Sequence, residues 1–168
     1  MSEKSSDLME RSLSPDQKLF LAGLAFLEDV SEDQTILEDP QNSERVRSVG
    51  ATLVRHFPQQ DIGVVKDFLP IDEMDAHRLY KMITVQSDML NDMEEQKLNM
   101  LGLYAFSYLT FGQIGKIYGL SKQAVHQTVI GRFNIWFHRK HSSRSFMRRS
   151  EDLRFFLQSS SPRLRLRR

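Results

Sequence analysis

Apolar residues recur at helical spacing along most of the chain, beginning with a well-marked helix start. Ser14 is a suitable N-cap, Pro15 suits the first helical position, and Gln17 follows three residues after the cap. The next positions are almost all apolar: Leu19, Phe20, Leu21, Ala22, Leu24, Ala25, Phe26 and Leu27. A helix this apolar either lies in the core of one chain or is shared with a second copy.

Further apolar stripes predict helices over about residues 43–57, 61–69, 72–90 and 94–109. The first two are expected to end before Pro58 and Pro70, because the residue that precedes a proline disfavours helix. Residues 31–42 contain Pro40 and several acids and are expected to form a solvated connection. Since no segment shows the sustained alternation of a half-buried strand, we expect an all-α helical bundle.

Residues 109–133 carry the most specific pattern in the chain. Thr110 can cap a short helix, Phe111–Tyr118, in which the small Gly115 leaves room for a crossing helix. Gly119 tolerates the positive φ that often ends a helix, and Ser121 can cap the helix that follows. Residues expected to fill the turn and the buried face of the second helix are Leu120, Ala124, Val125 and Val129. Two helices joined by a tight turn that contains glycine form a helix-turn-helix.

The second helix of such a unit can enter the DNA major groove, which is about 12 Å wide. Its residues that packing does not require are the candidate base contacts, namely Lys122, Gln123, His126 and Gln127. Candidate contacts to the DNA backbone are Thr110, Gln113, Ser121, Arg132, Arg139, Lys140, Arg144, Arg148 and Arg149. A plain helical hairpin within a bundle is the alternative interpretation of the same pattern.

Residues 111–115 (Phe-Gly-Gln-Ile-Gly), 118–121 (Tyr-Gly-Leu-Ser) and 124–125 (Ala-Val) resemble the helix-turn-helix of region four of bacterial sigma factors and related small regulators. The resemblance covers about residues 94–140. The chain differs from the usual sequence of that family at Gln113, Gly115, Tyr118, Leu120 and Ala124, mostly by substitution with similar residues. No upstream segment corresponds to the aromatic, strand-opening region two. The resemblance therefore implies a stand-alone DNA-binding regulator more readily than a factor that melts promoters.

Charge divides unevenly along the chain. Residues 1–131 contain 12 Lys or Arg against 20 Asp or Glu, whereas residues 132–168 contain 11 against two. A basic end on an acidic body favours a polyanionic partner. We expect the second helix to continue through Phe133, Trp136 and Phe137, a further basic helix over residues 146–157, and a flexible arginine-rich arm at 163–168.

The remaining composition narrows the class of protein. The chain has no cysteine, which excludes disulfides and cysteine-based metal sites, and its start lacks the pattern of a secretory signal, so a cytoplasmic protein is expected. No apolar run approaches the ~18 residues of a membrane span. His138 and His141 are flanked by cations, and no catalytic constellation is present, so we expect neither a metal, a cofactor nor an enzyme.

These observations predict four parts: a disordered segment 1–13, an acidic helical domain 14–90, a helix-turn-helix domain 91–141 and a basic extension 142–168. The expected function is sequence-specific binding of double-stranded DNA by a transcriptional regulator. The acidic domain is a candidate surface for a second copy or for RNA polymerase. Alternatives are an adaptor that contacts the transcription machinery without reading bases, and an RNA binder that uses the arginine-rich end.

Overall fold

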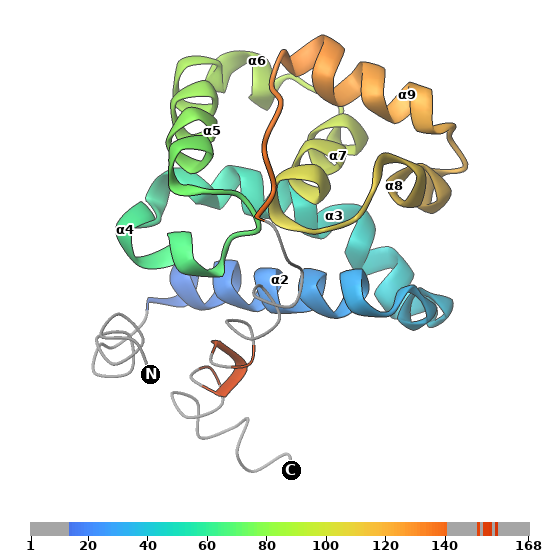
Figure 1. The fold of residues 1–168 in the computed structure, drawn as a ribbon, viewed down its shortest axis with the longest axis horizontal. Helices are drawn as coiled ribbons and strands as arrows, with labels where there is room; N and C mark the ends of the chain where they lie inside the picture. Colours follow the sequence, from blue (N-terminus) through green and yellow to red (C-terminus); the bar gives the residue numbers. More distant parts are fainter. Residues whose placement is uncertain (1–13, 141–150, 152, 156, 158–168) are drawn as a thin grey trace.

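A computed structural model describes residues 14–140, 151, 153–155 and 157 (Figure 1). Among these residues the fold is all-α, as predicted, and the only β feature is an isolated bridge between Ile71 and Arg139. The α-helices are α2 (Pro15–Glu32), α3 (Pro40–His56), α4 (Ile62–Val65), α5 (Glu73–Val85), α6 (Ser87–Asn91), α7 (Glu95–Phe106), α8 (Phe111–Tyr118) and α9 (Lys122–His126). The expectations for residues 1–13 and 163–168 lie outside the described residues.

Short helical turns join several of these elements. They are the 3-10 helices η1 (Gln34–Glu38), η2 (Phe57–Gln59) and η3 (Lys66–Phe68), and a π-helical turn, Gln127–Arg132, that continues α9. In the part of the chain that the structure describes, no helix combines the length and the apolar character that crossing a membrane requires.

Helix α2 begins as the sequence predicts. The Ser14 hydroxyl accepts the Gln17 backbone N–H at 3.1 Å, and the Gln17 side chain accepts the Ser14 N–H at 2.9 Å. Most of its apolar residues are buried within this one chain; Leu19 is 49% exposed and Ala22 is half-buried. The apolar character of α2 is thus accounted for by the core of a single chain.

The solvated connection predicted over residues 31–42 is confirmed in part: an exposed connection joins α2 to α3, but it spans only residues 33–39 and contains η1. Helix α3 begins at Pro40, with the Asp39 side chain accepting the Gln41 N–H at 2.9 Å. Proline is well suited to the first helical turn, where its missing N–H has no helical partner to lose. The helices expected over 61–69 and 72–90 are each divided in two, the second at Gln86.

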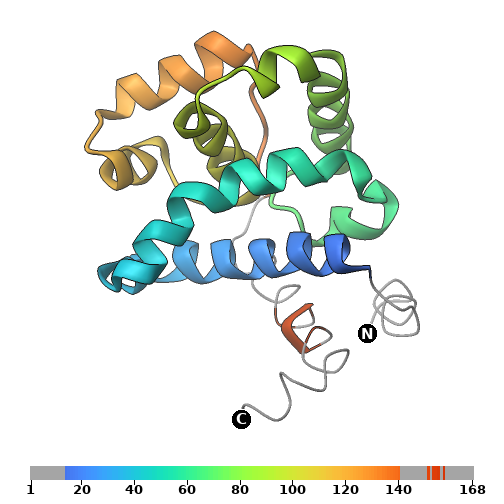
Figure 2. The ribbon, with the colours of Figure 1, turned by 180° about the vertical axis from the view of Figure 1, so that it is seen from behind.

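Helices α3 and α7 cross with almost no space between their backbones. A Cβ added to Gly102 would overlap the backbone of Gly50, and one added to Gly50 would overlap the carbonyl oxygen of Asn99. The buried Asn99 amide accepts the N–H of Ala51 at 3.0 Å and donates to the carbonyl oxygen of Val46 at 2.9 Å. Figure 2 shows α3 running between α2 and the upper helices, so this crossing joins the two parts of the bundle.

The core is built around aromatic rings from three segments. The ring of Phe20 in α2 lies 6.0 Å from that of Phe57 in η2 and 5.7 Å from that of Phe106 in α7, centroid to centroid. Buried apolar residues from Phe20 to Leu153 form one cluster with these rings. The segments before and after residue 90 therefore share a hydrophobic core.

The helix predicted to run through Trp136 and Phe137 is wrong, since helical structure ends at Phe133. Asn134 adopts a left-handed φ of 51°, a conformation that asparagine tolerates better than most residues. Residues 135–140 then run as an extended segment (Figure 1), with Ile135 and Phe137 buried and Trp136 exposed. This alternation is the period-2 pattern of a half-buried strand, but it spans too few residues to be distinguished from a helical stripe in the sequence.

Candidate nucleic-acid interface

Helix α8 has the ends that the sequence predicts. The Thr110 hydroxyl accepts the Gln113 N–H at 3.1 Å, and the Gln113 side chain accepts the Thr110 N–H at 2.9 Å. At the other end Gly119 has a left-handed φ of 68°, and its N–H donates to the carbonyl oxygen of Gly115. A residue with a Cβ would be strained at this position, so glycine allows the chain to turn directly into α9.

The turn between α8 and α9 is closed by backbone atoms. The N–H of Leu120 donates to the carbonyl oxygen of Gly115 at 2.8 Å, and a Cβ on Gly115 would overlap the carbonyl oxygen of Leu120. The space beside Gly115 is therefore filled by the turn and not by a crossing helix. The prediction that the Leu120 side chain plugs the turn is also wrong, because that side chain is 37% exposed.

Helix α9 begins at the predicted cap, where the Ser121 hydroxyl accepts the Ala124 N–H at 3.1 Å. Val125, Val129 and Phe133 follow at four-residue spacing and are all buried. With the π-helical turn Gln127–Arg132, α9 lies on the side of the molecule away from α2 (Figures 1 and 2).

The four predicted base contacts lie together on the outer face of α9 and its continuation. Lys122, Gln123, His126 and Gln127 are all exposed. Within the described residues, the side chains of Lys122, Gln123 and Gln127 make no hydrogen bond or ion pair. The His126 ring packs edge-on against Phe111, with 5.4 Å between centroids. Three polar side chains on this face are therefore available to a partner.

Some of the residues predicted to contact the DNA backbone are exposed, whereas others are already hydrogen-bonded within the chain. Thr110, Ser121 and Arg132 are exposed, and each cap hydroxyl still has a hydrogen to donate. Gln113 is partly buried, and both ends of its amide are used: the oxygen by Thr110 and the nitrogen by Gln34, at 3.0 Å. Gln113 therefore supports α8 and is not placed as a free phosphate contact.

The cations that follow α9 are placed differently from expectation. Arg139 lies over the ring of Tyr104 and donates to the Tyr104 carbonyl oxygen at 2.9 Å, and burial lowers the pKa of its guanidinium. The Lys140 ammonium donates to the carbonyl oxygen of Lys66 at 2.9 Å. Both side chains attach the extended segment to the body, so we remove them from the proposed DNA surface. Arg144, Arg148 and Arg149 lie outside the described residues.

The sequence around α8 and α9 is more strongly positive than the division of the chain into residues 1–131 and 132–168 suggests. No Asp or Glu occurs from residue 96 to residue 150, a stretch that contains nine Lys or Arg. Lys116, Lys122 and Arg132 from this stretch are exposed. An uninterrupted absence of acids from the second residue of α7 through α9 is a signal in the sequence itself, and it indicates a positive surface over these helices.

Asp75 anchors the extended segment, a role that the sequence did not reveal. Its side chain is buried and accepts the His138 N–H at 2.9 Å, while its other oxygen accepts from Arg78 at 2.8 Å. Tyr104 adds a second anchor, because its hydroxyl accepts the Phe137 N–H at 2.8 Å. The chain that leaves α9 is therefore attached to both α5 and α7.

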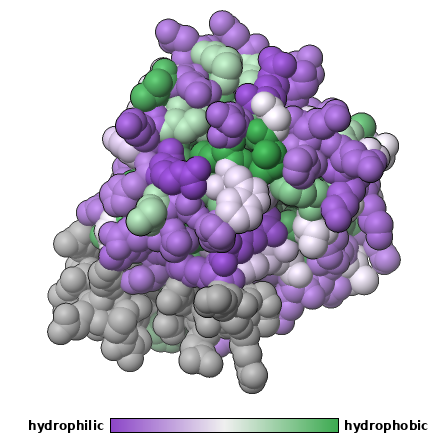
Figure 3. Space-filling view, turned by 45° about the horizontal axis from the view of Figure 1, so that its top comes forward, coloured by the Kyte–Doolittle hydropathy of each residue, from purple (hydrophilic) through white to green (hydrophobic). Residues whose placement is uncertain are grey.

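A hydrophobic patch interrupts the mostly hydrophilic face that Figure 3 shows. A shallow cavity of about 340 Å³ lies between α5 and residues 133–135, lined in part by Met82, Val85 and Ile135. The nearby Trp136 is 51% exposed, with its ring packed edge-on against His138. Exposed aromatic residues beside apolar surface are frequent in protein interfaces.

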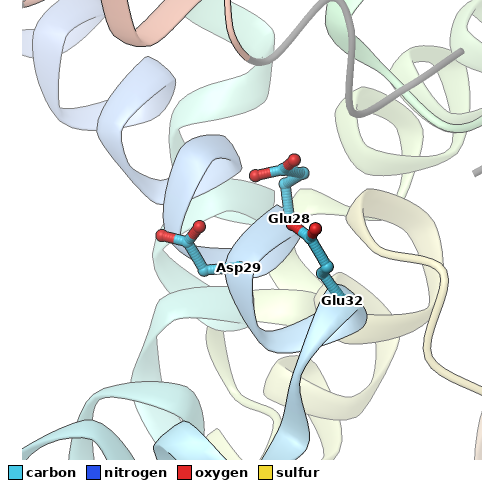
Figure 4. A group of neighbouring side chains, drawn as sticks. All are labelled: Glu28, Asp29 and Glu32. Carbon is cyan, nitrogen blue, oxygen red and sulfur yellow. The ribbon is translucent and has the colours of Figure 1, made fainter. Parts of the chain in front are cut away.

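Three carboxylates of α2, those of Glu28, Asp29 and Glu32, lie close enough to share a cation (Figure 4). A cation of the chain itself already reaches two of the three: the Arg154 guanidinium pairs with Glu28 and with Asp29 and donates to the carbonyl oxygen of Ala25. This acidic cluster is therefore explained by an internal ion pair.

No protein-family model, curated protein or solved structure matches the chain. The resemblance to region four of sigma factors thus rests on the residues of the α8–turn–α9 segment alone.

Proposed function

We propose that the protein is a sequence-specific DNA-binding transcriptional regulator that acts in the cytoplasm and uses α8, the turn at Gly119 and α9 as a helix-turn-helix. The observation that supports this most directly is the outer face of α9 and its π-helical continuation, where Lys122, Gln123 and Gln127 are exposed and make no internal hydrogen bond among the described residues. Glutamine can pair with adenine through two hydrogen bonds, and lysine donates to the acceptors of guanine.

Several other groups fit contacts to the DNA backbone. The hydroxyls of Thr110 and Ser121 begin α8 and α9 and can donate to phosphates, while Lys116 in α8 and Arg132 after α9 supply exposed positive charge. Because residues 96–150 contain no acid, no carboxylate in this stretch repels the duplex.

The test is to select duplexes from a random pool with the full chain, and to measure binding by fluorescence anisotropy. The selected duplex and a scrambled one are compared at about 50 mM and 200 mM salt, a range over which contacts to phosphate alone lose most of their affinity. We expect the preference for the selected duplex to persist at the higher salt. Equal binding that disappears with salt would leave only non-specific attraction and would contradict base readout.

A double variant, Gln123→Ala with Gln127→Ala, makes the test specific to α9. Each lost glutamine–adenine pair is expected to reduce discrimination by about 1–3 kcal/mol, with little change in binding to the scrambled duplex. Gln96→Ala is the matched control, because Gln96 is an exposed glutamine in the first turn of α7. An unchanged preference in the double variant would overturn the proposed role of α9.

The exposed Trp136 and the neighbouring cavity, which is partly lined by apolar residues, support a second candidate, an adaptor that contacts the transcription machinery through protein alone. Trp136 is the only tryptophan in the chain, so 5-fluorotryptophan labelling places a single 19F NMR signal on this face. A shift or broadening of that signal on addition of purified, unlabelled RNA polymerase, with no selection of any duplex, would favour the adaptor over the DNA reader.

A further inference from the structure

A cavity of about 370 Å³ lies where η1, α3 and α8 meet. Its polar lining includes Arg47 and Lys116 with the amides of Gln34 and Gln113, and its apolar lining includes Leu37 and Ile117. This volume is within the range of about 300–1,000 Å³ that is usual for small-molecule sites.

The charge of the cavity has one sign. Arg47 and Lys116 are its charged residues, and none of the described residues that line it is acidic. Neither cation forms an ion pair with any described carboxylate; Arg47 instead donates to the carbonyl oxygen of Ile117 at 3.1 Å. A guanidinium whose charge is not neutralised offers two parallel donors that match a carboxylate or a phosphate.

The apolar wall restricts the ligand further. Leu37 and Ile117 are partly buried and pack against the hydrophobic core, so they offer a surface that a fully hydrated ion would not cover. Inorganic ions would contact the cations but leave this wall in water. A molecule with an anionic head and a short apolar part would contact both.

We propose that this cavity binds a small organic anion, a carboxylate or a phosphate ester, with the charged group between Arg47 and Lys116 and the apolar part against Leu37 and Ile117. Binding itself does not depend on the proposed DNA function. The effect of an occupied cavity on DNA binding does rest on the proposed function.

The cavity lies beside the two side-chain hydrogen bonds that join α8 to η1 and α3. One is from Gln113 to Gln34, and the other is from Arg47 to the carbonyl oxygen of Ile117. An anion that draws the Arg47 guanidinium away from Ile117 removes one of these bonds. The occupied cavity therefore changes how α8 is held, and α9 follows because the turn at Gly119 is closed by backbone hydrogen bonds.

The experiment is an NMR titration of the full 15N-labelled chain with phenyl phosphate, benzoate and neutral benzyl alcohol. We expect saturable shifts around the cavity with one or both anions and none with the alcohol. Arg47→Gln is expected to weaken anion binding by about tenfold or more, the size of a lost charged hydrogen bond. Arg45→Gln is the matched control in the same helix, because Arg45 lies over the ring of Phe26 and does not line the cavity.

The absence of saturation, an equal response to the alcohol, or equal effects of the two variants would overturn the proposal. If Arg47→Gln weakens duplex binding while phenyl phosphate and benzoate give no response, the phosphate source is DNA and the small-molecule site is again overturned. Anion binding that is lost in Arg47→Gln, in a protein that selects no duplex, would retain the cavity and reject the proposed function.

Discussion

Gly50 and Gly102 face each other where α3 crosses α7, and a Cβ on Gly102 would overlap the Gly50 backbone. We expect Gly102→Ala to lower the free energy of unfolding by about 3 kcal/mol, because the helix backbones must move apart. Gly112→Ala is the control, since its Cβ would lie at an ordinary 3.8 Å from the Thr110 hydroxyl. Urea unfolding followed by circular dichroism measures both, and equal effects would argue against the close crossing.

A substitution at Gly119 tests the backbone conformation of the turn without adding a steric overlap, because a Cβ there would meet no atom within 4 Å. Gly119→Ala is expected to lower the free energy of unfolding by about 1–2 kcal/mol, which is the penalty for a residue with a Cβ in the left-handed conformation. Gly119→Asn should cost clearly less, since asparagine visits this conformation more readily. Thermal unfolding of the two variants makes the comparison, and an asparagine variant no better than the alanine variant would contradict the left-handed φ.

Asn99 and Tyr118 form a coupled pair that links the α3–α7 crossing to the end of α8. The Asn99 amide donates to the Tyr118 hydroxyl, and burial raises the pKa of Tyr118. Tyr118→Phe is expected to lower the free energy of unfolding by about 1 kcal/mol, and Asn99→Ala by about 2–3 kcal/mol because it removes three hydrogen bonds of a buried amide, to Ala51, Val46 and Tyr118. A double-mutant cycle should show a coupling energy of at least about 0.5 kcal/mol, whereas additive costs would show that the bond contributes nothing.

Arg132 offers a test of the backbone contacts that is independent of base readout. Arg132→Gln is expected to weaken binding to all duplexes alike and to reduce the slope of log affinity against log salt by about one. Lys18→Gln removes the same charge from α2, on the other side of the molecule, and should leave the slope unchanged. A salt series by anisotropy distinguishes them, and equal slopes would mean that Arg132 contacts no phosphate.

Asp75 tests the attachment of the extended segment. Asp75→Ala removes the acceptor of the His138 N–H and the partner of Arg78, at an expected cost of about 2–3 kcal/mol. Asp75→Asn keeps one acceptor oxygen and should lower the free energy of unfolding by less than Asp75→Ala does. Hydrogen exchange at the His138 amide is expected to accelerate in the alanine variant, and an unchanged rate would show that this bond does not protect the segment.

Local signals predicted the parts of the molecule that are set by neighbouring residues. The caps at Ser14, Thr110 and Ser121 and the left-handed Gly119 were predicted correctly, because each depends on residues within one helical turn. The exposed face of α9 was placed correctly for the same reason, since the spacing of Val125 and Val129 fixes which side is buried.

The sequence failed where distant segments decide the outcome. Arg139 looks like a free cation at a helix end, yet its partner is Tyr104, 35 residues earlier in the chain. Asp75 looks like one of several acids at a helix start, and its role depends on residue 138. The cavity beside Arg47 is likewise invisible in the sequence, because η1, α3 and α8 meet only in the folded chain.

The route of residues 134–140 limits how α9 can meet any long, stiff partner. The α8–α9 unit is tied to the bundle at its middle, where Asn99 contacts Tyr118, and just after its end, where Asp75 holds residue 138. Under the proposed function, α9 does not swivel on a flexible linker to follow the groove, so the rest of the bundle has to approach the duplex with it. Any remaining misfit has to be absorbed by curvature of the duplex, which favours operators whose base steps bend easily.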